Sequence, residues 1–204
     1  MIPVAEKTGL IFDIDRWVIE QALRQSAAWQ HEGSPVRVGI NISAAQFHHE
    51  RFMPLVDQLV EETGADPQYV DLEITEGMLI RDVDRALVNM RELAGRGFSL
   101  SIDDFGTGYS SLGYLKRFPV KQIKIDQSFI QDLGEKDSDS IVRAIIALAN
   151  NLDMLVLAEG VETDRQLQFL RDEGCDRVQG YYYSKALEAN RFEEWQRQGS
   201  TTWH

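Results

Sequence analysis

Ser99-Leu-Ser-Ile-Asp-Asp-Phe-Gly-Thr-Gly108 is the stretch that most constrains the fold of this chain. Leu100 and Ile102 alternate with Ser101 and Asp103, which is the two-residue period of a β-strand. Two glycines follow the paired aspartates, and glycine is suited to the sharp turn with which such a strand can end. The stretch therefore predicts a strand with one apolar face and one polar face.

The same alternation recurs along the chain. Segments rich in Val, Ile, Leu or Tyr predict strands at Val36–Ser43, Val70–Thr75, Ser99–Asp103, Gln122–Asp126, Met154–Glu159 and Arg177–Tyr182. Segments of helical period lie between them. This alternation of strands and helices implies an α/β fold in which helical crossovers join parallel strands.

Helix signals accompany this pattern. An N-terminal helix is expected from about Ile14 to Ala27, and a later helix carries an apolar stripe at Ile141, Ile145, Leu148 and Leu152. Two pairs have the spacing of helix-capping residues, namely Thr163 with Gln166 and Asn190 with Glu193.

The polar face of the strands favours a closed barrel over an open sheet. In an open doubly wound sheet both strand faces meet helices, so both should be apolar. Here one parity is polar in strand after strand, as in Asp71 with Glu73 and Lys124 with Asp126. We therefore expect a (β/α)8 TIM-like barrel whose apolar residues face the helices and whose polar residues face the interior. Active sites of such barrels lie at the carboxyl ends of the strands.

Composition limits the remaining possibilities. The 204 residues, 43% of them hydrophobic, suit one domain over residues 1–204, and the net charge of −12 argues against binding to long nucleic acid. Apolar runs such as Met154–Ala158 are far shorter than the roughly 20 residues of a membrane span. The single cysteine, Cys175, cannot form an intrachain disulfide and is predicted to be a core residue, so we expect a reducing, cytoplasmic location.

Oxygen donors gather at the predicted strand ends. They belong to four strands and are Asn41, Glu73, Asp103, Asp104 and Glu159. Hard divalent ions such as Mg²⁺ or Mn²⁺ take oxygen ligands, and two such ions can activate water and stabilise a phosphodiester leaving group. An isolated Asp-Asp pair more often only begins a loop, but the set of five ligands favours a two-ion site.

Lys124 and Asp126 share one face of their predicted strand. The lysine can hold an attacking water or neutralise a phosphate oxygen, with Asp126 fixing its position, or the pair can be an internal salt bridge that only fills the barrel. Glu76, just past its strand, either anchors the glycine loop 104–111 or is a surface residue. Gln179 can bond a base or a phosphate, although it is a weak signal alone. His48 and His49 are interpreted as exposed loop residues.

These residues stand in an order that resembles the EAL phosphodiesterase family. The resemblance covers essentially the whole chain, from a first helix at Ile2–Leu10 through the segments Asn41–Ser43, Leu72–Glu76, Ile102–Leu112, Ile123–Asp126, Ala158–Thr163 and Gln179–Tyr181. It implies hydrolysis of cyclic di-GMP to the linear dinucleotide pGpG in a bacterial signalling protein.

The resemblance also implies roles for individual positions. The metal positions are Asn41, Glu73, Asp103, Asp104 and Glu159, with Asp126 supporting the metal or the lysine. Lys124, Glu159 and Asp103 are the implied catalytic residues. Gln179 and Asn41 are the implied substrate contacts, and Glu76 is implied to anchor the loop. The implied cofactor is Mg²⁺ or Mn²⁺.

One departure from the family pattern qualifies this function. The family carries a Glu-Ala-Leu motif on a strand before the first helix, and the only similar string here is Ala186-Leu-Glu188. We therefore expect the first two strands of an eight-stranded barrel to be missing, the two-ion site to be incomplete, and hydrolytic activity to be impaired or absent.

Three further expectations depend on that departure. Open strand edges favour a homodimer or oligomer. An upstream GGDEF or sensory domain is a further expected partner. The alternative function is a catalytically impaired module that binds cyclic di-GMP or another protein.

Overall fold

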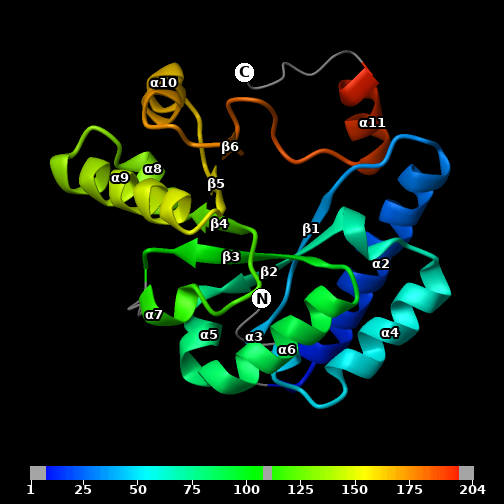
Figure 1. The fold of residues 1–204 in the computed structure, drawn as a ribbon. Coiled ribbons are helices and arrows are strands. Elements are labelled where there is room, and N and C mark those ends of the chain that lie inside the picture. Colours follow the sequence, from blue (N-terminus) through cyan, green and yellow to red (C-terminus); the bar gives the residue numbers. More distant parts are fainter. Residues whose placement is uncertain (1–7, 108–111, 198–204) are drawn as a thin grey trace. The chain divides into compact units, whose positions relative to one another are not determined.

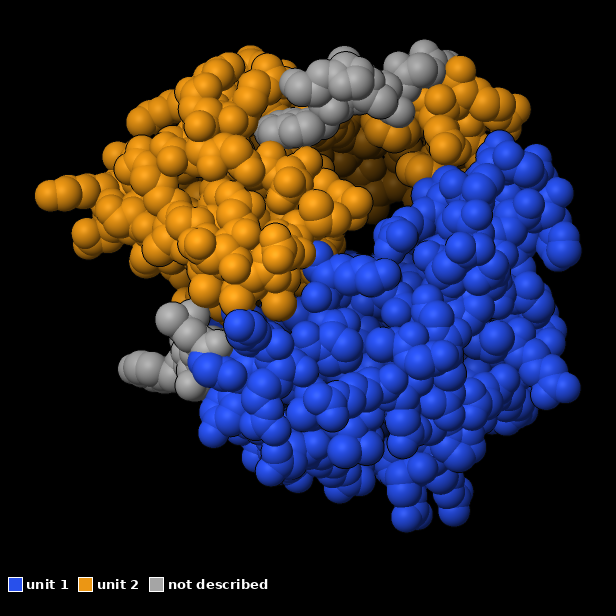
Figure 2. All heavy atoms as spheres, in the orientation of Figure 1, with its two compact units in different colours: residues 1–103, 107–121 blue, residues 104–106, 122–204 orange. Residues whose placement is uncertain are grey.

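The computed structural model of the chain describes residues 8–107 and 112–197. Helices and strands alternate along this part of the chain, as Figure 1 shows. The described residues form two compact units, which Figure 2 colours blue and orange. The first unit takes in residues 1–103 and 107–121, and the second takes in residues 104–106 and 122–204. The chain passes from one unit to the other after Asp103, Gly106 and Lys121.

The first unit contains three parallel strands. They are β1 (Val38–Asn41), β2 (Val70–Thr75) and β3 (Ser99–Phe105), of which the last two residues belong to the second unit. Its helices are α2 (Ile11–His31), α3 (Ala44–Phe47), α4 (Phe52–Thr63), the 3-10 helix η1 (Pro67–Tyr69), α5 (Glu76–Arg81), α6 (Val83–Gly95) and α7 (Leu112–Leu115). Strand order follows chain order, β1-β2-β3.

Register in these strands confirms the predicted alternation. Ile40 of β1 pairs with Leu72 of β2, which pairs with Leu100 of β3, and all three side chains are buried. The next row along the strands holds Asn41 and Glu73 as partners. Apolar and polar residues therefore form separate rows across the strands, as the period of two requires.

Helices α2 and α4 pack against each other, and α2 also contacts β1. The predicted helix from Ile14 to Ala27 lies inside α2, which buries Ile19 and Leu23. Helix α4 buries Phe52, Val56 and Leu59 and ends at Gly64 in the left-handed conformation, which is the usual C-terminal glycine stop. Periodicity therefore predicted the interior of α2 correctly.

The second unit is also parallel α/β. Its strands are β4 (Gln122–Ile125), β5 (Leu155–Ala158) and β6 (Arg177–Val178), in that order, and its helices are α8 (Gln127–Gln131), α9 (Lys136–Asn151), α10 (Asp164–Asp172) and α11 (Ala189–Arg197). Helix α9 packs on β4, β5 and α8. The α/β class and the parallel strands are thus confirmed, while the two missing strands and an eight-stranded barrel stay predictions.

Three predictions about local structure in the second unit are wrong. Strand β6 holds only two residues instead of Arg177–Tyr182, because the chain turns at Gly180, whose carbonyl accepts the N–H of Tyr183. Asn190 does not cap a helix, since α11 begins at Ala189. The stripe that begins at Ile141 is only partly buried, because α9 buries Ile145 together with Val142, Ile146 and Ala149 and leaves Ile141 exposed.

Two other predictions about this unit, the capping pair at Thr163 and the buried position of Cys175, are confirmed. Thr163 and Gln166 form a reciprocal capping box at the start of α10. Cys175 is buried. Among the described residues, no helix has the length and apolar content that a membrane crossing requires.

Candidate metal centre

Three carboxylates gather where β3 and β5 end. Asp104 and Glu159 belong to the second unit, and Asp103 is joined to Asp104 by a peptide bond. Each of the three offers one oxygen, and these oxygens lie within 4.8 Å of one another. Like charges at this separation repel each other, so the group requires a neighbouring positive charge or a bound cation.

The backbone at Asp104 explains how two adjacent residues serve one group. Successive side chains of a regular strand point to opposite faces. Asp104 has φ 53°, a left-handed conformation that non-glycine residues rarely adopt. This turn breaks the alternation, so the carboxylate of Asp104 can approach the one of Asp103. Strained conformations of this kind are most common at functional sites.

Lys124 supplies positive charge inside the second unit. Its Nζ lies 2.8 Å from Oε1 of Glu159, and the lysine side chain is only 3% exposed while the glutamate side chain is 19% exposed. The lysine comes from the middle of β4, and the glutamate follows β5 directly. Because β4 and β5 are parallel neighbours, their register fixes this ion pair.

Gly160 keeps the segment after Glu159 in place. It has φ 72°, and a Cβ added there would lie 2.7 Å from Cβ of Gln127. Any larger residue would therefore both strain the backbone and clash with α8. Glycine at this position holds the strand end close to α8, and with it the carboxylate of Glu159.

The polar rows of the first unit form a second, buried set of groups. Ser101 donates a hydrogen bond to Asp71 on the neighbouring strand, and both are buried. Glu73, the next polar residue of β2, is half-buried, and its register partner Asn41 is exposed at the end of β1. A Cβ added at Gly39 would lie 2.4 Å from Oε1 of Glu73. The glycine therefore makes room for that carboxylate.

The other predicted site residues have different surroundings. Glu76 is the first residue of α5 and is 2% exposed, so it is not the surface residue of the alternative reading. Asp126 follows β4 and caps α8, accepting the N–H of Ser128 at 2.9 Å. It lies outside the group of three carboxylates. Gln179 follows β6 and is exposed.

Oxygen-only donors decide which metal fits the group. Carboxylates suit Mg²⁺, Mn²⁺ or Ca²⁺, whereas a thiolate or imidazole ligand would favour Zn²⁺. The carboxylate group contains neither histidine nor cysteine. The residues present therefore fit a hard divalent cation.

The fold and the site together define a class of protein. It is a parallel α/β protein with a carboxylate cluster at its strand ends and a buried lysine beside that cluster. The EAL domain family matches residues 1–186 of the chain. The chain therefore belongs to the EAL domain family, as its motifs predict.

Relatives with known names support this assignment. The chain is 42% identical over 194 residues to the signalling protein YkoW of Bacillus subtilis, covering 95% of this chain and 24% of that protein. It is 42% identical over 192 residues to the bifunctional diguanylate cyclase/cyclic di-GMP phosphodiesterase MucR of Pseudomonas aeruginosa (93% and 28%). It is 40% identical over 195 residues to the cyclic di-GMP phosphodiesterase PdeR of Escherichia coli (95% and 30%). The chain thus spans 24% to 30% of these relatives' length.

A solved structure shows the same fold. The phosphodiesterase PaMucR in complex with c-di-GMP superposes with a TM-score of 0.92 at 41% identity, covering 94% of this chain and 78% of that one. The sequence motifs therefore identified the family and the α/β fold correctly.

The sequence analysis misjudged one pair of residues. His48 and His49 were interpreted as exposed loop residues, but both are only half-exposed and line a cavity of the first unit. The signal that could have found them is their position seven and eight residues after Asn41, beyond a short helix that Ser43 caps. Part of the expected first helix, Ile2–Lys7, and part of the glycine loop, residues 108–111, lie outside the described residues.

Proposed function

We propose that this chain hydrolyses cyclic di-GMP to pGpG with the help of Mg²⁺ or Mn²⁺. The observation that carries the proposal is the cluster of Asp103, Asp104 and Glu159 beside the ammonium group of Lys124. Support comes from the names of PdeR and MucR, both cyclic di-GMP phosphodiesterases, and from the complex of PaMucR with c-di-GMP.

The proposed reaction adds one water across one of the two phosphodiester bonds of the ring. The water oxygen bonds to phosphorus, and the bond from phosphorus to the 3′ oxygen breaks. A proton passes to that oxygen, and the product is a linear dinucleotide with a 5′ phosphate. Only one bond is cut, so pGpG is the expected product rather than two mononucleotides.

The carboxylates are the proposed metal ligands. Asp103, Asp104 and Glu159 would hold a divalent cation, and the family resemblance adds Asn41 and Glu73 as further positions. Bound cations of this kind lower the pKa of a coordinated water and offset the charge of the phosphodiester.

Lys124 is proposed to act on the water or on a phosphate oxygen. Its ion pair with Glu159 holds Nζ in one place, and burial keeps competing water away from it. Because Glu159 also belongs to the carboxylate cluster, it links the lysine to the metal ligands.

Four residues have proposed supporting roles. Exposed Gln179 and Asn41 are proposed to contact the substrate. Buried Glu76 is proposed to anchor the loop after Asp104. Asp126 was expected to support the metal or the lysine, but its carboxylate accepts hydrogen bonds from Ser128, and this favours a role in orienting β4 and α8 through the cap.

The test is turnover of cyclic di-GMP with Mg²⁺ or Mn²⁺, followed by chromatography for pGpG. Asp103→Asn should lower the rate by a factor of about 100 or more, which is typical for removal of one preorganised electrostatic group. Asp137→Asn, which removes the same charge from the exposed first turn of α9, should leave the rate unchanged. A folded chain that binds cyclic di-GMP without forming pGpG would instead support the alternative of a binding module.

We also propose two partners. The first is a second copy of this chain, which would contact the exposed apolar face of α2. The second is an upstream GGDEF or sensory domain, supported by the name of the bifunctional cyclase and phosphodiesterase MucR and by the greater length of the relatives.

A further inference from the structure

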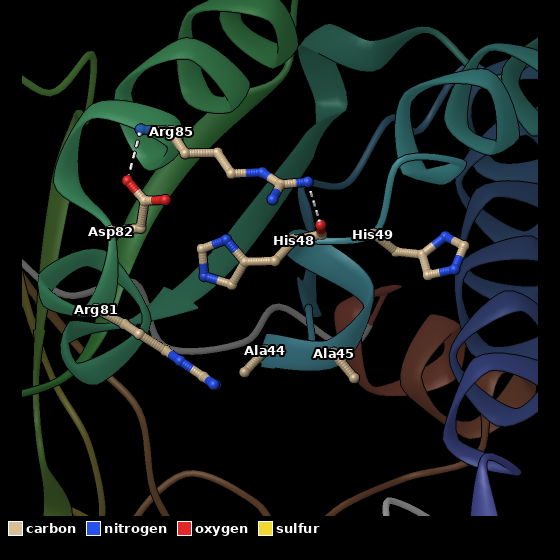
Figure 3. A pocket seen from close by; sticks show the side chains of 7 residues that line it. All are labelled: Ala44, Ala45, His48, His49, Arg81, Asp82 and Arg85. Carbon is tan, nitrogen blue, oxygen red and sulfur yellow. Dashed lines mark hydrogen bonds between the residues drawn. The ribbon is translucent and has the colours of Figure 1, made fainter.

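The first unit contains a cavity of about 650 Å³. Figure 3 shows it between the short helix α3 and the junction of α5 with α6. Its lining consists of Ala44, Ala45, His48, His49, Arg81, Asp82 and Arg85. None of these residues belongs to the carboxylate cluster or to the residues proposed for hydrolysis.

The charge of this lining is opposite to that of the chain. The chain has a net charge of −12, yet the cavity is lined by two arginines, two histidines and one acid. The acid, Asp82, is committed to the fold, because its Oδ1 accepts the N–H of Arg85 at 3.2 Å and caps α6. The cavity therefore presents positive charge to a ligand.

Arg85 is fixed in position at the cavity wall. Its Nη2 donates a hydrogen bond to the carbonyl of His48 at 2.7 Å, and Figure 3 shows this bond. A guanidinium has five N–H donors, so the others stay available to a ligand. A side chain that is already fixed loses less conformational freedom on binding, so the entropic cost of binding is lower.

Arg81 is the second guanidinium. It extends from the end of α5 toward Ala44 in Figure 3 and is exposed. Within the described residues, no hydrogen bond or ion pair occupies its guanidinium. The two alanines of α3 have small side chains, which leave room for a ligand between Arg81 and that helix.

The two histidines differ in their surroundings. The ring of His49 packs edge-on against Phe12 of α2, with 4.8 Å between ring centroids, and its Nδ1 accepts the N–H of Arg51. The ring of His48 lies on the side of α5 in Figure 3, and its Nε2 has no hydrogen-bond partner among the described residues. His48, which lines the cavity, therefore carries a buried polar atom without a partner, and such atoms are uncommon in folded proteins.

We propose that this cavity binds the phosphate monoester of a small molecule. Guanidinium groups match the oxygens of a phosphate and form charge-assisted hydrogen bonds with it, and two of them line this cavity. A volume of about 650 Å³ is within the range of small-molecule sites and exceeds what a bare phosphate ion needs. This proposal does not rest on the proposed hydrolysis, since it uses other residues and needs no divalent cation.

The test is calorimetric titration of the full chain in EDTA with inorganic phosphate, adenosine 5′-monophosphate and adenosine. EDTA prevents a metal at the carboxylates from binding phosphate. We expect adenosine 5′-monophosphate to bind more tightly than inorganic phosphate and adenosine to give no binding heat. Arg81→Gln should weaken the binding of adenosine 5′-monophosphate by about tenfold or more, the effect of losing one charge-assisted hydrogen bond. Arg81→Lys keeps the charge but not the forked donors, so its affinity should lie between those of the parent and of Arg81→Gln.

Matched controls separate this site from general electrostatics. Arg91→Gln removes the same charge from an exposed position of α6, on the helix that carries Arg85, and should change the affinity less than twofold. Asp103→Asn should leave the affinity unchanged, whether or not the chain hydrolyses cyclic di-GMP. Absence of binding heat, equal weakening by Arg91→Gln, or equal affinity for inorganic phosphate and the monoester would each overturn the proposal.

Discussion

Nζ of Lys124 lies 2.8 Å from Oε1 of Glu159, and the lysine side chain is almost completely buried. Glu159 also contributes an oxygen to the cluster that it forms with Asp103 and Asp104. One carboxylate therefore connects a buried cation with the proposed metal ligands. Removing either charge changes the surroundings of the other, because a buried charge depends on its partner for compensation.

Lys124→Met tests the proposed role of this ion pair. The change keeps the length of the side chain and removes the ammonium group. We expect the rate of pGpG formation to fall by about 100-fold or more, within the range for loss of an acid–base group. Stability should fall by about 1 to 3 kcal/mol, since the part-buried Glu159 loses its partner. Initial rates and urea unfolding measure the two effects.

Lys121→Met is the matched control for this change. Lys121 is exposed and directly precedes β4. Its replacement should alter neither the rate nor the stability by a measurable amount. A Lys124→Met chain that keeps its full rate would contradict a catalytic role and leave the pair a structural feature of the second unit.

Gly39→Ala tests the space beside Glu73. The added methyl group would lie 2.4 Å from Oε1 of Glu73, so the carboxylate or the strand must move. We expect a loss of about 1 to 3 kcal/mol in the free energy of unfolding, which is typical of overpacking. If Glu73 is a metal ligand, Mn²⁺ affinity should fall as well. Urea unfolding and calorimetry with Mn²⁺ measure these effects.

Gly77→Ala provides the comparison. Gly77 is exposed in α5, and a Cβ added there meets nothing within 4 Å. Alanine favours helix over glycine, so this variant should be at least as stable as the parent. Unchanged Mn²⁺ affinity in Gly39→Ala, together with lowered stability, would argue against Glu73 as a ligand.

The strand rows and the strand-end acids were predictable because their physical cause is local. The alternation of Leu100 and Ile102 with polar residues depends only on the two-residue period of a strand, and it persists in the structure. The acids that follow such strands must then lie near the strand ends. In the sequence, only the glycines after Asp104 indicated the left-handed turn at this residue.

What could not be predicted depends on tertiary contacts. Helix α9 has two neighbouring apolar stripes, and packing on β4 and β5 buries the one with Val142 and Ile146 while Ile141 remains 38% exposed. Similarly, the partner of Lys124 follows from register between β4 and β5, which no spacing in the sequence reveals. Asp126 resembled a site residue, and its helix cap became visible only in the structure.

The thiol of Cys175 leads to a prediction about pH. Burial raises the pKa of this thiol from an ordinary value of 9.0 to about 11. Between these values the unfolded chain releases the proton while the folded chain keeps it, so the stabilising effect is complete below pH 9 and is lost as the pH rises toward 11. Two units of pKa correspond to about 2 to 3 kcal/mol.

The measurement is urea unfolding of the parent chain and of Cys175→Ala between pH 8 and pH 11. Other groups titrate in both chains, so only the difference between them reports on the thiol. We expect the stability advantage of the parent to shrink by about 2 to 3 kcal/mol over this range. Iodoacetamide should modify the folded chain slowly at pH 8 and the unfolded chain quickly. A constant difference together with rapid modification of the folded chain would show that the thiol is accessible and has an ordinary pKa.

Helix α2 carries the proposed surface for self-association. Leu10, Ile14, Trp17 and Val18 are exposed by 54%, 41%, 63% and 39%, and their spacing places them on one side of the helix. Trp17 is the largest of them, and buried aromatic residues dominate the energy of many interfaces.

We therefore expect the parent chain to form a dimer that Trp17→Glu disrupts, as measured by light scattering over a wide range of concentrations. Val88→Glu, which adds the same charge at another exposed apolar position, should leave the dimer intact. A parent chain that stays monomeric at the highest concentration would refute self-association, and a dimer unaffected by Trp17→Glu would place the interface elsewhere.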